Sequence, residues 1–353
     1  MKIGLIDADF LNQSKSRFPN LALMKMSGAF KAAGHNVVFS DWDISAYNIV
    51  YVSKVFTKSA CSPAIWNSEK VIYGGTGFYP DGGGPNLLSN IEHHMPDYDL
   101  YGDLGNSDYF TDFSIGFTTR GCFRGCGFCV NKNKKESVKW SPVSEFLDAE
   151  RKYICLLDDN FLACRDWKLI LNELKDTGKK FQFKQGLDIR LFSEDKAKEF
   201  ADANYLKEYI FAFDSFLDES PVVKGLQTWR DSNNTSEGKV YLLAGYESRG
   251  KFDIISIFER IRIISAYSCL PYLMRYELVD GSEFEGLYTQ LARWCNQPQF
   301  FKKTTFREFC ELRQTEMKTD KKCSAKLSLE RFEQKHPDVA KKYFDAKFWE
   351  ERK

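Results

Sequence analysis

Short apolar runs alternate with helical segments along most of the 353-residue chain, and this alternation limits the fold more than any other feature. In the first hundred residues the strand-like runs are 3–7, 37–40, 48–52 and 71–73, and the helical segment is 21–33. Gly34 follows that segment, where glycine commonly ends a helix. Strands that alternate with helices usually pair in parallel, with helices on the sheet faces. The sequence therefore predicts an α/β domain with a flavodoxin- or Rossmann-like parallel sheet over residues 1–105.

A second series of strands begins near residue 113. Its strand-like runs are 113–117, 153–158, 181–188, 209–214, 240–245 and 271–277, and helical stretches such as 166–176 and 252–266 lie between them. Six such units predict a partial (β/α)6 barrel over residues 106–290, with its site at the C-terminal ends of the strands. The aromatic-rich remainder, 291–353, predicts a small helical region that packs against the barrel.

A loop with three cysteines directly follows the first strand of this second series. Cys122, Cys126 and Cys129 have the spacing C-x3-C-x2-C, with glycines between them. Thiolates at such spacing are typical ligands of an iron–sulfur cluster. A [4Fe–4S] cluster has four irons, so three cysteines leave one iron without a protein ligand from the loop. Zinc is the alternative, but a structural zinc site takes four ligands, and no fourth Cys or His is near in the sequence.

This loop resembles the signature of the radical S-adenosylmethionine (radical SAM) superfamily, and Phe128, directly before the third cysteine, belongs to the resemblance. The resemblance implies that the open iron binds the amino and carboxylate groups of S-adenosyl-L-methionine (SAM). It also implies a reductase of flavodoxin or ferredoxin type that supplies one electron. Cleavage of SAM would then yield methionine and a 5′-deoxyadenosyl radical, which abstracts hydrogen from a substrate. Nothing in the sequence identifies that substrate.

The first domain, placed before such a loop, resembles the cobalamin-binding subclass of this superfamily. Gly74-Gly75-Thr76-Gly77 follows a strand, where α/β sheets bind ligands, and Gly82-Gly83-Gly84 comes soon after. The D-x-H-x-x-G element that supplies an axial His to cobalamin is missing, because residues 7–12 contain no His. Three interpretations stay open: a hydrogen-abstracting enzyme, a cobalamin-dependent methyltransferase or methylthiotransferase, and a non-catalytic iron–sulfur protein.

Polar residues and a glycine follow the C-terminal ends of the predicted barrel strands. They are Asp158 and Asp159, then Gln185, Asp188 and Arg190, then Asp214, and finally Gly245 and Glu247. By the resemblance, Asp158 or Asp159 recognises the SAM amino group, Asp214 contacts the ribose, and Gly245 and Glu247 lie near the adenine. Taken singly, an acid at a strand end is more often a helix N-cap. Arg190 either pairs with a ligand carboxylate or phosphate, or forms a buried ion pair.

Composition limits the partners and the compartment. The formal net charge is +1, which does not favour a nucleic-acid partner. Ten cysteines spread over a long chain without a signal peptide favour the reducing cytoplasm. No apolar run approaches the length of a membrane span, so we expect no membrane partner.

Two other groups of potential ligands have alternative interpretations. Cys295, Cys310 and Cys323 either hold an auxiliary cluster or, given their wide spacing, are buried thiols of a helical region. His93-His94 is either a metal site or a solvated loop, and the absence of a carboxylate at ligand spacing favours the loop.

Overall fold

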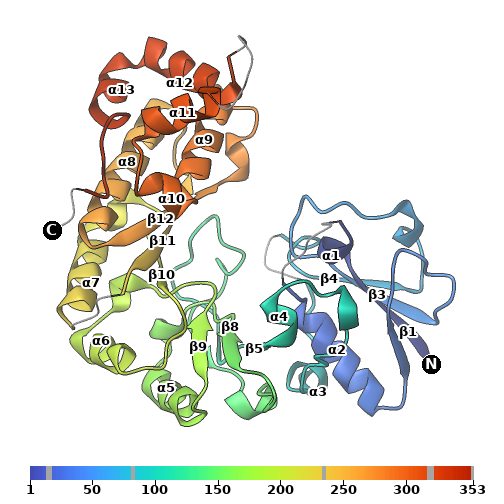
Figure 1. Cartoon of the computed structure of the whole chain (residues 1–353). Coiled ribbons are helices and arrows are strands. Elements are labelled where there is room, and N and C mark those ends of the chain that lie inside the picture. The colour runs from blue at the N-terminus through green and yellow to red at the C-terminus, as the bar shows by residue number, and fades with distance from the viewer. Residues whose placement is uncertain (13–17, 81–83, 233–235, 316–321, 351–353) are drawn as a thin grey trace. The chain divides into compact units, whose positions relative to one another are not determined.

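The structure is a computed structural model that describes residues 1–12, 18–80, 84–232, 236–315 and 322–350 (Figure 1). It is an α/β protein with several parallel sheets, which confirms the α/β part of the prediction. The chain divides into two compact units, each described here by itself. Unit 1 consists of residues 1–185 and 204–206, and unit 2 consists of residues 186–203 and 207–353.

The first sheet of unit 1 contains the four strands that the sequence predicts near the N-terminus. Its strands are β1 (Lys2–Asp7), β2 (Asn36–Phe39), β3 (Ile49–Ser53) and β4 (Val71–Gly74). They pair in parallel in the order β2-β1-β3-β4, so the strand order reverses between β1 and β3.

Successive residues of β1 point to opposite faces of this sheet, as the period of a strand requires. Ile3 and Leu5 pack with Leu23 and Met24 of α2 (Leu21–Ala32). Ile6 instead packs with residues of β3, β4 and η1 (Pro63–Ile65) on the other face. The helices of the first face also include α3 (Ser89–Glu92) and α4 (Asp108–Thr111), and the second face is covered by the short α1 (Ala8–Asn12), η1 and loops.

A second sheet of unit 1 begins the second strand series. Its strands are β5 (Phe113–Gly116), β8 (Tyr153–Leu156) and β9 (Lys180–Phe183), which pair in parallel in the order β5-β8-β9. Phe113, Ile115 and Cys155 line one face and pack with Leu21. The connections carry η2 (Gly102–Leu104), η3 (Val143–Glu145), η4 (Phe161–Ala163) and α5 (Trp167–Asp176).

The predicted strand 181–188 is too long. The structure ends β9 at Phe183, and Gly186 has a φ of 91°. A positive φ cannot continue an extended strand, and glycine adopts it without strain. Leu187 then makes an isolated parallel bridge to Phe211.

Unit 2 contains the remaining three predicted strands. They are β10 (Tyr209–Ala212), β11 (Gly238–Ala244) and β12 (Cys269–Arg275), paired in parallel in that order. The accompanying helices are α6 (Glu194–Ala201), α7 (Glu219–Asp231) and α8 (Lys251–Ala266), with η5 (Ile189–Leu191), η6 (Phe216–Asp218) and η7 (Glu277–Val279) at strand ends. All six predicted strands are present, in two three-stranded sheets.

The C-terminal part of unit 2 is helical, as predicted. It contains α9 (Glu285–Cys295), α10 (Pro298–Phe301), α11 (Phe306–Thr315), α12 (Ser324–Lys335) and α13 (Pro337–Tyr343). Phe258 of α8 stacks on Tyr343 and Phe348, with ring centroids 5.2 and 5.8 Å apart. The late aromatic residues therefore form packing contacts, as the sequence indicates. Within the described residues, no helix combines the length and the apolarity that crossing a membrane requires.

Candidate functional site: the cysteine loop and the strand ends

A small antiparallel hairpin holds together the two ends of the cysteine loop. After β5, the chain forms β6 (Thr119–Arg120), which pairs antiparallel with β7 (Val138–Lys139). Residues 121–137 lie between these two strands. The backbone N–H of Trp140 also donates to the carbonyl of Thr118, at 2.8 Å. The hairpin therefore holds together the two ends of a segment that contains all three cysteines of the motif.

The path of the loop depends on glycine at its start. Gly121 has a φ of 93°, and a Cβ added there would lie 2.3 Å from the carbonyl oxygen of Glu136. Gly125 also has a positive φ, of 60°. Both the backbone conformation and the close approach at Gly121 exclude a larger residue without rearrangement. Gly121 thus has a specific steric role at the start of the loop.

The sulfur atoms of two cysteines accept N–H hydrogen bonds. Cys122 Sγ accepts from the backbone N–H of Arg124 at 3.5 Å and from Asn160 Nδ2 at 3.4 Å. Cys129 Sγ accepts from the backbone N–H of Asn131 at 3.4 Å. All three cysteines of the loop are half-buried. Donors directed at sulfur stabilise negative charge on it, and such bonds help set the potential of cysteine-bound clusters.

That the three cysteines hold an iron–sulfur cluster stays a prediction from their spacing. Among the described residues, no three His, Cys, Asp or Glu side chains are gathered so as to hold one metal ion, and this includes the three cysteines. Ligands of one ion must converge on one centre. In a [4Fe–4S] cluster each thiolate binds a different iron, so its ligands surround a larger body. Cys122, Cys126 and Cys129 are the residues that would hold such a cluster.

The end of β8 supports the start of the loop through Asp158. This side chain is only 1% exposed. Its Oδ2 accepts from Thr118 Oγ1 at 2.9 Å, and its Oδ1 accepts from Thr119 Oγ1 at 3.1 Å and from the Thr119 backbone N–H. Burial raises the pKa of Asp158 to about 7, although these hydrogen bonds oppose the shift.

Asp159 contacts residues on both sides of the three cysteines. Its Oδ2 accepts from the backbone N–H of Gly121 at 2.7 Å, and its Oδ1 accepts from Asn131 Nδ2 at 2.8 Å. Asn160, the next residue, donates to Cys122 and precedes η4 without a side-chain capping bond. The contacts that the structure shows for Asp158 and Asp159 are thus with the loop. Their role toward the SAM amino group stays a prediction.

Tyr109 and two residues of the β9 region form a polar cluster that sequence reasoning missed. Tyr109 Oη accepts from Gln182 Nε2 at 3.0 Å and from Lys184 Nζ at 2.9 Å. Gln182 and Lys184 are two positions apart, so the period of a strand could have indicated that they share a face.

The predicted Gln185 is exposed, and the predicted Phe128 is half-buried in the loop.

In unit 2, Arg190 is held by two carboxylates, which corresponds to the ion-pair alternative. Its Nε lies 2.7 Å from Asp188 Oδ1, and its Nη1 lies 2.6 Å from Asp218 Oδ2. Asp188 also caps η5 by accepting from the Arg190 backbone N–H at 3.3 Å. Asp218 lies 28 residues after Arg190, and no local pattern indicated it.

Asp214 has a buried acceptor atom without a partner. Its Oδ1 is buried and has no hydrogen-bond partner. The neighbouring helix η6 is capped by Ser215, whose Oγ accepts from the Leu217 backbone N–H at 3.2 Å, so Asp214 does not act as this N-cap. Burial raises the pKa of Asp214 to about 6, against the attraction of Arg260 and Arg190. A buried acceptor without a donor is suited to receive a ligand hydroxyl.

Arg260 fixes the strand ends around Asp214. It is 1% exposed and donates to the backbone carbonyls of Phe213 at 2.9 Å, Asp214 at 3.0 Å and Leu243 at 2.9 Å. These carbonyls follow β10 or belong to the end of β11. Planar guanidinium geometry allows one side chain to serve several acceptors at once. Arg260 lies in mid-helix within α8, and sequence reasoning did not select it.

Gly245 and Glu247 differ in their surroundings. The Gly245 N–H donates to Asp253 Oδ2 at 2.8 Å, its φ is 80°, and an added Cβ would lie 2.1 Å from Val279 Cγ2. Glycine is therefore required at this turn by packing as well as by conformation. Glu247 is exposed. Their predicted places near the adenine stay predictions.

The first domain shows polar groups where its strand order reverses. At the end of β1, Asp7 accepts from Tyr101 Oη at 2.6 Å and from the Phe10 backbone N–H at 3.0 Å. Ser53, at the end of β3, accepts from Asn20 Nδ2 at 2.8 Å. Carboxylate, hydroxyl and amide groups thus occupy the position at which α/β sheets usually bind ligands. None of these groups is the His side chain that a His-ligated cobalamin requires, and the absence of that ligand stays a prediction.

The predicted glycine loop packs on the preceding strand connection. Gly77 donates its N–H to the carbonyl of Lys54 at 2.8 Å, and a Cβ added at Gly75 would lie 2.3 Å from the same oxygen. The close approach of the Lys54 backbone therefore accounts for glycine at positions 75 and 77, and no bound ligand is needed to explain it. Gly82 and Gly83 lie outside the described residues.

His93 has a carboxylate neighbour that the local sequence spacing does not indicate. His93 Nδ1 lies 2.8 Å from Glu145 Oε2, a residue 52 positions later in the chain. Beside it, Glu92 Oε1 accepts from Lys25 Nζ at 2.9 Å and from Trp140 Nε1 at 3.1 Å. Trp140 directly follows β7, so this network connects α2 and α3 to the base of the cysteine hairpin.

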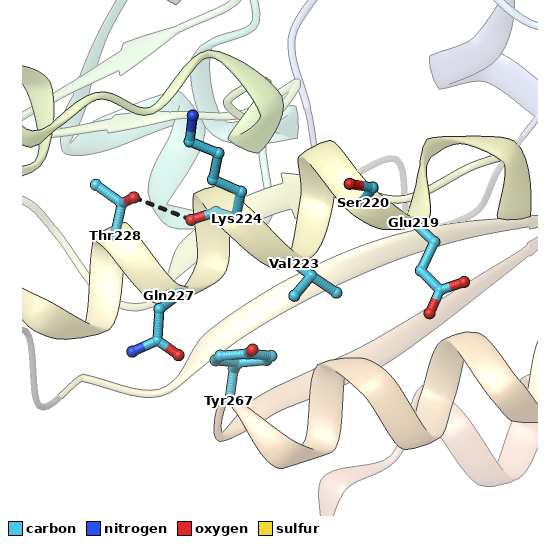
Figure 2. A pocket seen from close by; sticks show the side chains of 7 residues that line it. All are labelled: Glu219, Ser220, Val223, Lys224, Gln227, Thr228 and Tyr267. Carbon is cyan, nitrogen blue, oxygen red and sulfur yellow. Dashed lines mark hydrogen bonds between the residues drawn. The ribbon is translucent and has the colours of Figure 1, made fainter.

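A pocket of about 570 Å³ lies along α7 in unit 2 (Figure 2). Its lining residues are Glu219, Ser220, Val223, Lys224, Gln227, Thr228 and Tyr267. The hydroxyl of Thr228 donates to the carbonyl of Lys224 at 2.9 Å, within the same helix. None of these residues belongs to the predicted site, and we assign no ligand to this pocket.

Comparison with models of known protein families found no match, and a search of curated proteins found no similar sequence.

Proposed function

We propose that this protein is a radical SAM enzyme that holds one [4Fe–4S] cluster with Cys122, Cys126 and Cys129. The observation that carries the proposal is the cysteine loop itself. It combines C-x3-C-x2-C spacing with N–H donors directed at Cys122 and Cys129. When bound, the cluster would supply the electron that cleaves SAM to methionine and a 5′-deoxyadenosyl radical, which abstracts hydrogen from an unidentified substrate.

The remaining proposed roles belong to residues at the strand ends. Asp214 offers a buried acceptor without a partner, which suits a ribose hydroxyl of SAM. Arg260 holds the backbone on either side of that acceptor. Gly245 forms the tight turn after β11, beside the proposed adenine position. A one-electron reductase of flavodoxin or ferredoxin type would supply the reducing equivalent.

Two features of the fold support this proposal at a finer level. The first sheet has the order β2-β1-β3-β4, which corresponds to the order found in flavodoxin-like sheets. The two three-stranded sheets supply the six parallel strands that a partial (β/α)6 barrel requires. We therefore propose a cobalamin-domain-like first domain, without a His-ligated corrinoid, followed by a radical SAM barrel.

The test is anaerobic reconstitution of the full chain with iron and sulfide, followed by reduction with dithionite in the presence of SAM. We expect about four irons per chain, the broad visible absorption of an iron–sulfur cluster, and formation of 5′-deoxyadenosine. A variant with Cys122, Cys126 and Cys129 all changed to Ala should lose all three signals. The matched control is Cys61→Ala, which removes a half-buried thiol outside the loop.

Each outcome of this experiment discriminates between the open interpretations. A full cluster in the triple variant would overturn the ligand assignment. A cluster without SAM cleavage would favour a non-catalytic iron–sulfur protein. Corrinoid bound after supplementation would favour the cobalamin-dependent alternative over the hydrogen-abstracting enzyme.

A further inference from the structure

We infer that Asp159 and Asn160 are positioning residues that clamp the cysteine loop, at the place where the family resemblance implies a SAM-binding element. This inference rests on the proposed function for its purpose, but the contacts that support it are independent of any ligand. Asp159 binds Gly121 at 2.7 Å and Asn131 at 2.8 Å, and Asn160 binds Cys122 at 3.4 Å.

The positions of these contacts along the chain explain why they act as a clamp. Gly121 is one residue before the first cysteine, and Asn131 is two residues after the last. One carboxylate therefore bridges the two ends of the segment that contains every proposed ligand. Bridging the ends of a loop reduces the number of conformations open to it. Hydrogen bonds to a charged acceptor are also stronger than those between neutral groups.

The clamp has a rigid base. Asp159 and Asn160 follow the buried strand β8, whose residues Ile154 to Leu156 are fully buried. Asp158, immediately before them, binds Thr118 and Thr119 on the other side of Gly121. Three consecutive residues thus hold consecutive parts of the loop. Sites supported by strands are held more precisely than sites supported by loops alone.

Asn160 should also influence the reduction potential of the cluster, in addition to holding the loop in place. Its amide donates to Cys122 Sγ, which also accepts from a backbone N–H. A donor to a ligating sulfur stabilises the more negative, reduced state of a cluster and raises its potential. Replacing Asn160 with Ala should therefore make the reduction potential of the cluster more negative. A purely structural change far from the sulfur would not do so.

The first test uses the full chain before reconstitution and measures the alkylation rate of each thiol by mass spectrometry with iodoacetamide as the probe. In Asp159→Ala, we expect Cys122, Cys126 and Cys129 to react about tenfold faster, because the loop opens more often when two bonds are lost. Cys61, in another loop of the same unit, should react at an unchanged rate. Unchanged rates at the three loop cysteines would overturn the clamp.

Two further variants give the control and the rescue. Asp112→Ala removes a carboxylate that pairs with Lys152 at 3.1 Å, just before β5 begins, and should leave the loop rates unchanged. Asp159→Asn combined with Asn131→Asp restores a carboxylate–amide pair with the partners exchanged. This double variant should return the rates toward those of the wild type. Rates as fast as in Asp159→Ala would show that the pair itself is not the clamp.

The second test separates the clamp from binding of the SAM amino group. Each oxygen of a carboxylate has two acceptor sites, so the contacts with the loop leave acceptor capacity. In reconstituted Asp159→Ala, the clamp predicts faster loss of iron but an unchanged SAM dissociation constant for the chains that keep the cluster. A stable cluster with weakened SAM binding would overturn the inference and assign Asp159 to SAM. If the wild type takes up no cluster, the proposed function fails, while the alkylation rates still decide the clamp.

Discussion

At the scale of single residues, the protein buries several acids whose charged form is disfavoured. Asp7 is 2% exposed, and burial raises its pKa to about 6 despite the hydrogen bond from Tyr101. Asp214 shows the same direction, and its Oδ1 has no partner. Acids of this kind are often found at functional positions, but structural networks produce them as well. The two residues therefore lead to different predictions.

Asp7 should make stability depend on pH in the acidic range. Its unfolded pKa is near 3.8 and its folded pKa is about 6, so the folded state binds the proton more tightly. This contribution to stability is fully present below pH of about 4 and is lost as the pH rises through about 6, with a total of about 2 to 3 kcal/mol. Asp7→Asn should remove this dependence. Urea unfolding at pH 4.5 and 7.0 measures it, and equal pH dependence in wild type and variant would contradict the assignment.

Asp214 should affect the binding of SAM rather than the stability of the fold. Asp214→Asn removes a buried charge that lacks a hydrogen-bond partner on Oδ1, so we expect unfolding stability to stay equal or to rise. The loss of a charged acceptor should weaken SAM binding by about 1 to 3 kcal/mol. Calorimetry on cluster-loaded protein gives the affinity, with Asp112→Asn as the control. Unchanged affinity would show that Asp214 does not contact SAM.

At the scale of elements, the base of the cysteine hairpin is tied to α2 and α3 by a buried ion pair. Lys25 and Glu92 are both mostly buried, and Glu92 also accepts from Trp140. Burial lowers the pKa of Lys25, and Glu92 opposes that shift. Burial raises the pKa of Glu92, but Lys25 and Trp140 outweigh it and hold that pKa below its usual range. The pair is thus ionised and depends on both partners.

Removing one partner of this pair should lower the unfolding free energy more than removing both. Lys25→Met leaves Glu92 buried without its cation, and we expect a loss of about 3 to 5 kcal/mol in unfolding free energy. Lys25→Met combined with Glu92→Leu should lose much less, because no uncompensated charge remains. Denaturant unfolding of the two single variants and the double variant completes the cycle. A double variant as unstable as the sum of the singles would show that the pair is not coupled.

The cysteine loop as an element should be sensitive to Gly121. Gly121→Ala combines a positive φ with a Cβ that would meet the Glu136 carbonyl at 2.3 Å. Gly178→Ala is a matched control, because Gly178 has a φ of 67° and an added Cβ would meet no atom within 4 Å. The control should lose about 1 to 2 kcal/mol in stability, from conformation alone, and keep the cluster. We expect Gly121→Ala to lose cluster binding, and full iron content in it would contradict the steric role.

At the scale of the whole molecule, burial sorts the ten cysteines into two classes. Cys61, Cys122, Cys126 and Cys129 are half-buried, and the other six are buried. The buried ones are Cys155, Cys164, Cys269, Cys295, Cys310 and Cys323. Burial raises the pKa of Cys155, Cys269 and Cys310 to about 12, which makes their thiolates scarce at neutral pH. This corresponds to the buried-thiol interpretation of the C-terminal cysteines.

Alkylation of the native protein without a cluster should therefore modify at most four thiols, and alkylation in denaturant should modify all ten. Intact-mass measurement with iodoacetamide at pH 7.5 distinguishes the two conditions. Once a cluster is bound, Cys61 alone should remain reactive among the four. Rapid modification of Cys295, Cys310 or Cys323 in the native chain would show that these thiols are accessible and would reopen the auxiliary-cluster alternative.

The sequence by itself determined the strands of the parallel sheets, the main helices and the three cysteines, because these depend on residues that are close in the chain. It did not indicate the β6–β7 hairpin. The period of apolar residues set β1, β5 and β8 to within two residues, and a glycine marked the end of α2. The largest error in a predicted strand is at the end of β9, because a glycine inside a strand pattern leaves its φ undetermined. The spacing of the cysteines can likewise be recognised without knowledge of the fold.

Only the tertiary structure decided which side chains meet. Asp158, Asp159 and Asn160 lie 28 to 40 positions from the residues that they bind in and before the loop. Glu145 lies 52 positions from His93, and Arg260 reaches carbonyls as far as 47 positions away. Contacts at such separations follow from strand pairing and from the placement of loops at strand ends, which no local pattern contains. Two of the strand-end acids that the sequence selected as SAM contacts, Asp158 and Asp159, hold the cysteine loop and its start in the folded chain.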